Sequence, residues 1–309
     1  MPTPINRQVN YKPSAADILA LETQLTTAYN DQFDAVPQTY TKIATVIPMD
    51  ERGMSFAWLT SDDDLEEFDP NVGRVIKFLE AHNARIEVRK FTKTLGLTFE
   101  DLRDGKLTTA ILTAAGIGRS TKRHPDRLVY GVLKNNGMCY DRLPLFDDAH
   151  PQKVDQDDGG PTFSNQNTGG AVGAPYWYLL RPEAHPVLFG VRNGEGYSFS
   201  TLGADSDNGF LKEQILFGVR ARVTAAGGLP QFAYRSNKPL TAENLEAAVA
   251  AMEGIKGPEG QPISNSPTVL VVPKSLRASS KQLILGDRND KGGYNPWFGA
   301  MELIVSDYL

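Results

Sequence analysis

The chain has 309 residues, of which 40% are hydrophobic and 22% are charged, and its formal net charge is -5. This composition is typical of a folded protein with one large core or two smaller ones. Acidic and basic residues are interspersed, without the basic tail or stripe that neutralises phosphates, so the sequence argues against tight DNA binding. The single cysteine, Cys139, excludes an intrachain disulfide framework and fits folding in a reducing cytoplasm. We interpret it as a small buried apolar residue.

Secretion and membrane insertion are not expected. Residues 1–7 lack the continuous apolar stretch of a signal peptide. No later segment approaches the ~18 apolar residues that a membrane-spanning helix needs. The 20 prolines and 28 glycines are spread along the chain, so bead-like domains joined by one linker are not expected either.

The first predicted element is a helix that begins at Ala15. Ser14 and Asp17 form a capping box in front of it. An apolar stripe of about four turns follows at helical spacing. Its members are Ile18, Leu21, Leu25 and Ala28. The stripe must pack against another part of the chain or against a neighbouring copy.

Residues 40–97 have β character. Two runs rich in β-branched and aromatic residues, 43–47 and 54–59, flank a segment with turn composition, which predicts a β-hairpin or a pair of strands. A capping signal at 61–64 precedes an irregular region, because a proline and a glycine interrupt it. From 85 to 89 charged and apolar residues alternate, which predicts a strand that continues toward Leu97.

A long helix is predicted next. Thr98 and Asp101 form a second capping box. The apolar stripe behind it consists of Leu107, Ala110, Ile111, Ala114 and Gly118. Pro125 cannot continue an undistorted helix, so the helix kinks or restarts there, and the helical region ends near residues 136–137.

The second half mixes helices and strands. Residues 150–175 contain little beyond small and polar residues and proline, which predicts a long, exposed and mobile loop. Strands are predicted at 215–223, 232–234, 268–272 and 301–305. Thr241 is the predicted N-cap of a helix that ends at Gly254. The buried face of this helix consists of Leu245, Ala248, Val249 and Met252.

Two segments could carry chemistry. Residues 116–121 partly resemble a phosphate-binding loop, but they follow a helical stripe rather than a strand, and a bend in a helix explains them better. Asp147, Asp148 and His150, with Asp141 nearby in sequence, could supply ligands to a divalent ion. Polar residues before a proline are also ordinary turn chemistry.

The sequence assigns no catalytic, cofactor-binding or metal-binding residues. No H-E-x-x-H, paired-cysteine or G-x-S-x-G motif occurs, and the other histidines, His82, His124 and His185, are scattered. A metal- or nucleotide-dependent enzyme that uses the region from Asp141 to His150 remains the alternative hypothesis.

The order of several short segments resembles the Mu-like phage major head protein family, also called the gpT family. The segments in the first half are RIEV at 85–88, TFED at 98–101, HPDRLV at 124–129, CYD at 139–141, LFD at 145–147 and HP at 150–151. Those in the second half are FGVRAR at 217–222, LTAEN at 240–244, PTVLVVP at 267–273, NPWFG at 295–299 and ELIVS at 302–306. The chain departs from the family at Arg142, where a glycine is usual, at Pro230, where an aromatic residue is usual, and at 69–73.

The resemblance implies an α+β chain with the Hong Kong 97-type phage capsid fold. Residues 1–40 would be the N-terminal arm, 41–97 the extended loop (E-loop) and 98–136 the spine helix of the peripheral domain. Residues 137–309 would form the axial domain and the remaining peripheral-domain strands. Deletion of 1–40 is expected to leave a foldable core that forms no closed shells.

The implied function is that of a major capsid protein and not of an enzyme. Copies would assemble as pentamers and hexamers into an icosahedral shell around double-stranded DNA, which the acidic chain would contact only weakly. Scaffold, portal and decoration proteins are the other expected partners, no membrane is expected, and the location is the virion, after synthesis in the host cytoplasm. Another virion component or a nanocompartment shell is a further alternative.

Overall fold

The computed structural model describes residues 15–56, 84–139, 141–152, 160–202, 211–257, 260–288 and 292–309. The chain divides into two compact units. The first unit comprises Met1–Gln38, Arg89–His124 and Gly194–Arg222. The second comprises Thr39–Val88, Pro125–Asn193 and Val223–Leu309. No helix within the described ranges is long and apolar enough to cross a membrane.

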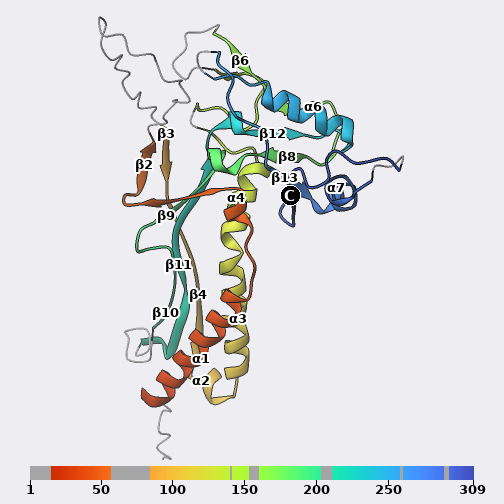
Figure 1. The fold of residues 1–309 in the computed structure, drawn as a ribbon. Coiled ribbons are helices and arrows are strands. Elements are labelled where there is room, and N and C mark those ends of the chain that lie inside the picture. The colour runs from red at the N-terminus through yellow and green to blue at the C-terminus, as the bar shows by residue number, and fades with distance from the viewer. Residues whose placement is uncertain are drawn as a thin grey trace, which may run out of the picture. The chain divides into compact units, whose positions relative to one another are not determined.

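Two helices form the core of the first unit. Helix α1 (Ala15–Asp34) packs along α3 (Leu107–Lys122), as Figure 1 shows. The apolar stripe of α1 is confirmed, although Tyr29 is more deeply buried than Ala28 and the helix continues to Asp34. Ser14 of the expected cap lies outside the described residues. Because α1 contributes to this core, deletion of residues 1–40 would expose apolar surface on α3; the foldable core expected after this deletion stays a prediction.

The expected long helix is divided. Thr98 does form a capping box with Asp101, but the helix that follows, α2 (Phe99–Arg103), is short. Gly105 has a φ of 77°, a left-handed conformation that ends a helix, and α3 begins only at Leu107. The restart at Pro125 is confirmed, because α3 ends at Lys122 and α4 spans His124–Lys134.

Three strands complete the first unit. These are β4 (Arg89–Thr98), β10 (Tyr197–Leu202) and the first half of β11 (Gln214–Gly227). β10 pairs antiparallel with β11, and β4 also pairs with β11. The Phe199 ring on β10 stacks on Tyr29 of α1 at a centroid distance of 4.5 Å. The strand predicted at 215–223 is therefore confirmed and is longer than expected.

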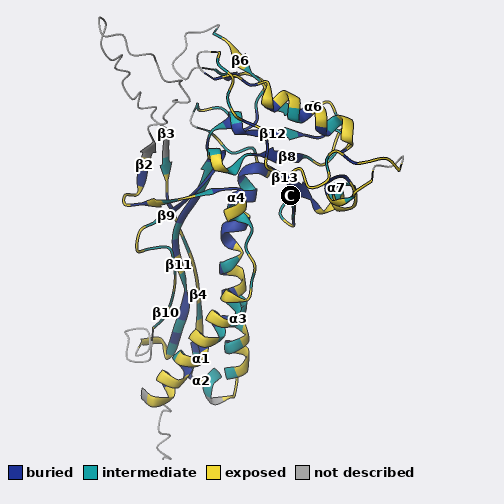
Figure 2. Ribbon diagram, viewed as in Figure 1, coloured by how far each residue is buried: buried dark blue, intermediate teal, exposed yellow. Residues whose placement is uncertain are grey.

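A five-stranded sheet organises the second unit, with the order β14-β13-β8-β12-β7. The strands are β7 (Gln166–Asn167), β8 (Trp177–Leu180), β12 (Ala233–Ser236), β13 (Val269–Pro273) and β14 (Glu302–Ser306). Every residue of β8 and β13 is buried, and both strands are dark blue in Figure 2. The apolar run at 268–272 therefore forms the covered strand that was predicted.

Two helices pack on one face of this sheet. Helix α6 (Ala242–Glu253) starts at its predicted N-cap, where the Thr241 hydroxyl accepts a hydrogen bond from the Asn244 amide at 3.3 Å. Helix α7 (Arg277–Leu285) was not predicted from the sequence. Alternate residues of the central strands, such as Trp177 and Leu179 of β8, share one apolar cluster with Leu245 of α6 and Ile284 of α7.

The strands in 45–56 do not form a hairpin. β1 (Thr45–Met49) pairs in parallel with β9 (Val187–Arg192), whereas β2 (Gly53–Phe56) pairs antiparallel with β3 (Ala84–Glu87). β9 also pairs with the second half of β11. Pro48, expected in the turn, lies within β1, which is an edge strand and therefore tolerates the missing amide proton. The alternative of two separate strands is thus confirmed.

The segment 150–175, expected to be a long loop, contains three strands of two residues each among its described residues. β5 (His150–Pro151) pairs antiparallel with β6 (Thr162–Phe163), and β7 joins the five-stranded sheet. Four short 3-10 helices occur at Tyr40–Lys42, Pro182–Ala184, Pro230–Phe232 and Lys274–Leu276. The segment predicted as a long exposed loop therefore contains short strands, and His150 and Asn165 within it are buried. Cys139 is half-buried rather than fully buried.

Candidate functional site

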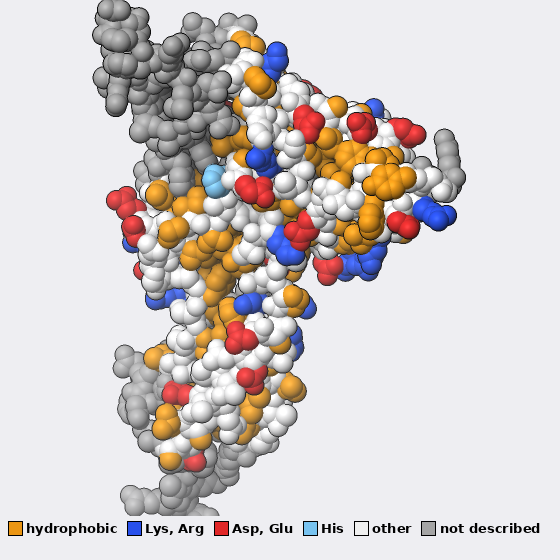
Figure 3. Space-filling model, in the orientation of Figure 1, with side chains coloured by type: hydrophobic (Ala, Val, Ile, Leu, Met, Phe, Trp, Pro, Cys, Tyr) orange, Lys and Arg blue, Asp and Glu red, His pale blue; other side chains and the backbone are white. Residues whose placement is uncertain are grey.

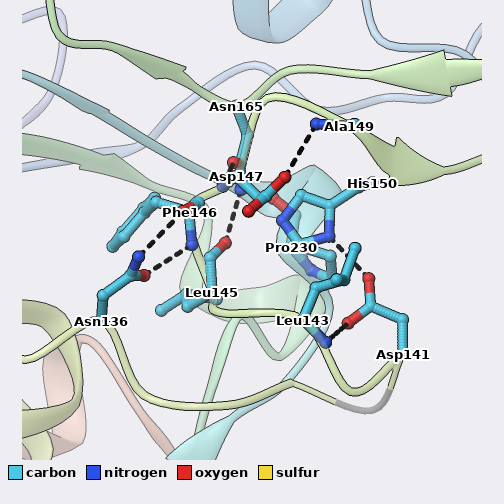
Figure 4. Close-up of polar contacts among 10 residues, drawn as sticks. All are labelled: Asn136, Asp141, Leu143, Leu145, Phe146, Asp147, Ala149, His150, Asn165 and Pro230. Atoms are coloured by element: carbon cyan, nitrogen blue, oxygen red, sulfur yellow. Dashed lines mark hydrogen bonds and ion pairs between the residues drawn. The ribbon is translucent and has the colours of Figure 1, made fainter.

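The site begins where α4 ends, at a turn of the second unit. Asn136 has a φ of 52°, in the left-handed region that asparagine tolerates better than most residues. Its side-chain amide donates to the Phe146 carbonyl at 2.9 Å, and its carbonyl accepts from the Phe146 amide at 2.8 Å (Figure 4). This pair of hydrogen bonds ties the Asn136 side chain to the backbone of Phe146, ten residues further along the chain.

Asn165 connects three segments of the same unit. Its side chain accepts from the Asp147 amide at 2.9 Å and donates to the carbonyls of Leu145 at 2.7 Å and Pro230 at 3.0 Å. Asn165 is completely buried. Because buried backbone groups without partners are costly, this one side chain satisfies three of them together.

A buried pair of one histidine and one aspartate lies beside Asn165. The Nδ1 atom of His150 is 2.6 Å from Oδ2 of Asp141, and both side chains are almost fully buried. The other Asp141 oxygen accepts from the Leu143 amide at 3.0 Å. The imidazole stacks on Phe163, with 5.3 Å between centroids, while its Nε2 atom has no hydrogen-bond partner among the residues that the structure describes. A carboxylate that orients a histidine is the arrangement in which a base is held for catalysis or for a metal.

The four residues proposed as metal ligands do not converge. Asp147 accepts from the Ala149 amide at 3.0 Å, which is ordinary turn chemistry. Asp148 accepts from the Ser164 hydroxyl at 3.1 Å, a contact with a separate segment of the chain. Within the described ranges no group of three or more His, Cys, Asp or Glu residues could hold a metal ion. Only the pair Asp141 and His150 comes together.

The remaining histidines and the glycine-containing segment lie elsewhere. In the first unit, His124 contacts the Tyr197 hydroxyl at 2.6 Å. In the second unit, His185 contacts the Thr45 hydroxyl at 2.7 Å. His82 lies outside the described residues. Residues 116–121 lie inside α3, where backbone amides are engaged in helical hydrogen bonds, so they form no phosphate-binding loop and no bend is needed to explain them.

Aromatic rings and one arginine pack next to the segment that Asn136 and Asn165 hold. The Arg235 guanidinium lies over the rings of Phe146, at 5.1 Å, and Tyr176, at 4.7 Å. Burial raises the pKa of Tyr178 to about 12, and the neighbouring Arg235 charge opposes that rise. The Tyr178 hydroxyl is therefore neutral at physiological pH. The arrangement ties residues 145–147 to Asn136 and Asn165, which is a structural role.

Arg142 explains one departure from the family pattern. Its φ is 65°, a left-handed conformation that glycine adopts without steric cost. The sequence reasoning missed Asn136 and Asn165, which organise this site. Their segments are rich in small polar residues, a composition typical of exposed loops, so no periodic signal marked the half-buried Asn136 or the buried Asn165.

Nearly the whole chain, and not only the region around Asn165, is similar to solved capsid subunits. A subunit in the procapsid of bacteriophage JBD30 has a TM-score of 0.77 and 30% identity, over 96% of this chain and 100% of that one. A subunit of the JBD30 capsid decorated with minor capsid protein trimers has a TM-score of 0.71 and 24% identity, over 89% and 92%. The α+β fold is thus the Hong Kong 97-type fold of phage major capsid proteins.

Sequence comparison defines the family within that class. The chain is 30% identical over 304 residues to the major capsid protein of Escherichia phage Mu, covering 95% of this chain and 98% of that protein. Residues 18–309 match the family model described as Mu-like prophage major head subunit gpT. The chain belongs to this family of major head subunits.

Proposed function

We propose that this chain assembles with copies of itself into the icosahedral shell of a phage head that encloses double-stranded DNA. The observation that carries the proposal is the match in fold and sequence over almost the whole length of a procapsid subunit. The two units suit such a role, because each has its own apolar core and can contact different neighbours.

The division of labour along the chain is part of the proposal. Residues 1–40 would act as the N-terminal arm, 41–97 as the E-loop, 98–136 as the spine helix, and 137–309 as the axial domain with the remaining peripheral strands. The extended strand β4 supports the E-loop assignment. Helix α3 supports the assignment of the spine helix. Helix α1 lies within the proposed arm, so this arm also contributes to the core of the first unit.

Partners beyond the chain itself are proposed as scaffold, portal and decoration proteins. Decoration is supported by the JBD30 capsid, which shares the fold and is decorated with minor capsid protein trimers. Contact with the packaged DNA would be weak and nonspecific, because the net charge of -5 offers little attraction to phosphates.

We propose no catalytic role for the chain. The alternative enzyme hypothesis is tested by replacing Asp141, Asp147, Asp148 and His150 with alanine and measuring bound metal and assembly. Altered assembly with no change in metal content supports the structural role, because Asp141 and His150 hold the loop in place. Loss of a stoichiometric metal ion would support the enzyme.

Assembly of the purified protein tests the main proposal. Negative-stain electron microscopy and light scattering would follow the full chain across protein and salt concentrations, with and without a co-expressed scaffold. We expect closed shells or rings of five and six subunits. A species that is monomeric or dimeric under every condition, scaffold included, would contradict the proposal.

A further inference from the structure

Helices α6 and α7 of the second unit carry single and opposite signs of charge. The charged residues of α6 are Glu243, Glu246 and Glu253, with no lysine or arginine. Residues 274–285, which include α7, carry Lys274, Arg277 and Lys281 with no acid. All six residues are exposed. In Figure 3 acidic side chains lie over α6, and basic side chains lie around α7 together with acidic ones.

Several of these charges oppose the stability of the helices that carry them, although the helix dipole favours Glu243 in the first turn of α6. Glu253 is the last residue of α6, where the helix dipole disfavours a negative charge. Arg277 is the first residue of α7, where the dipole disfavours a positive charge. Arg277 and Lys281 are also one helical turn apart, a spacing at which like charges repel. Glu253 accepts a hydrogen bond from Ser266 at 2.6 Å. Within the described ranges Glu246, Arg277 and Lys281 make no ion pair.

The two helices lie toward opposite edges of one sheet face. α6 packs on β12, whereas α7 packs on β13 and β14, and the strand order β14-β13-β8-β12-β7 separates these sites. The acidic and basic surfaces of one copy are therefore displaced from each other. A contact between the α6 surface of one copy and the α7 surface of the next would be heterologous, the kind of contact that generates closed rings.

An apolar patch adjoins the basic surface. Leu285 ends α7 and is 56% exposed, while Tyr294 and Phe298 are 77% and 51% exposed. Their segment is tied to α7, because the Gly299 amide donates to the Ile284 carbonyl at 2.8 Å. Aromatic and aliphatic side chains bordered by charges are typical of protein interfaces. Exposed alanines on α6, at positions 247, 250 and 251, would allow a close approach.

We propose that the acidic face of α6 docks on the basic face of α7 in the adjacent copy, and that this contact repeats around each ring of the shell. The proposal rests on the self-assembly proposed above and adds the surfaces that carry it. The flanking segments bear both signs, at Lys256, Asp287 and Arg288, so the complementarity is confined to the two helices.

Charge reversal tests the pairing. One variant, the α7 reversal, carries Arg277→Glu with Lys281→Glu, and the other, the α6 reversal, carries Glu243→Lys with Glu246→Lys. Each should raise the protein concentration needed for assembly on the order of tenfold at low salt, and less at high salt. The chain with all four changes has the net charge of the wild type and should assemble near the wild-type concentration.

A mixture of the two single-helix variants gives a sharper result. The α7 reversal is acidic on both surfaces and the α6 reversal basic on both, so they pair only in alternation. Rings of six allow strict alternation, whereas rings of five must contain one repulsive contact. Electron microscopy of the mixture should therefore show six-membered rings restored and five-membered rings depleted.

Circular dichroism and thermal unfolding confirm that each variant folds. If the α7 reversal does not fold, Arg277→Gln with Lys281→Gln replaces it, and a smaller loss of assembly is expected. If all variants assemble like the wild type, or if the four changes together fail to restore assembly, the pairing is overturned while shell formation stands. If the wild type itself forms no rings or shells, it is the proposed function that fails.

Discussion

Asparagine side chains determine the loop geometry of the second unit. Asn165 and Asn136 fix the loop after α4. Asn295 does the same beyond α7, where it donates to the carbonyls of Leu283 and Gly286, both at 2.7 Å. An asparagine side chain can replace a missing backbone partner in both directions, which a purely apolar residue cannot.

Replacing Asn165 with alanine should therefore destabilise the subunit strongly. The change removes the Asn165 partners of the Leu145 carbonyl and the Asp147 amide, and one of two donors to the Pro230 carbonyl, which keeps the Ala233 amide. We expect a loss of about 2–4 kcal/mol in the free energy of unfolding. Urea denaturation of the unassembled subunit measures it. Asn193→Ala is the matched control, because Asn193 is exposed, and it should cost less than about 0.5 kcal/mol. Equal effects at the two positions would refute this role for Asn165.

Asp126 gives the unit a dependence on pH. It is buried in the first turn of α4 and accepts from the amides of Thr39 at 3.0 Å and Tyr40 at 2.7 Å. Burial raises the pKa of its carboxyl above 3.8, and the two hydrogen bonds oppose that rise. Between 3.8 and the raised pKa the folded state binds more protons than the unfolded state, so this group's contribution to stability falls as pH rises through that window.

Asp126→Asn should remove that contribution and keep both bonds, which end on the same oxygen. We expect its stability at pH 7 to lie within about 1 kcal/mol of the wild type, and Asp126→Ala to lose about 1–3 kcal/mol. Denaturation between pH 4 and 8 separates the two variants. An asparagine variant as unstable as the alanine variant would show that the charge, not the hydrogen bonding, matters.

At the scale of elements, the spacing of α1 and α3 depends on one glycine. A Cβ atom at Gly118 would lie 2.3 Å from the Tyr29 carbonyl oxygen of α1, so any side chain there pushes the helices apart. Gly116, one half-turn away, would place its Cβ 3.9 Å from the flexible Arg119 side chain. Of the two glycines that resembled part of a phosphate loop, Gly118 thus serves close helix packing and Gly116 does not.

Gly118→Ala should destabilise the first unit by about 1–3 kcal/mol through overpacking. Gly116→Ala should instead be neutral or stabilise by up to about 1 kcal/mol, because alanine is the better helix former. Chemical denaturation compares the two. A stable Gly118→Ala variant would mean that α1 and α3 do not require this close approach.

Elements with strong periodicity were predictable and those defined by partners were not. The stripes of α1 and α6 and the apolar run of β13 carried clear signals. The pairing of β1 with β9 depends on residues about 140 positions away, as in Thr45 with Leu188, and no local pattern reveals it. The break at Gly105 and the short helix α7 lacked a distinctive composition, so the sequence did not predict them.

At the scale of the whole molecule, the order of short segments was more informative than any motif. No catalytic set could be assembled from the residues, yet the ordered segments predicted a capsid fold that the match to the JBD30 procapsid subunit confirms. The metal hypothesis depended on residues close in sequence, but Asp147 stabilises a local turn and Asp148 contacts Ser164 instead.

Cryo-electron microscopy of particles assembled from the full chain tests the central claim most directly. We predict closed shells with icosahedral symmetry, in which density for this fold repeats in rings of five and six. Helical tubes, or the absence of any closed particle even with a scaffold present, would contradict the assignment of this chain as a shell-forming head subunit.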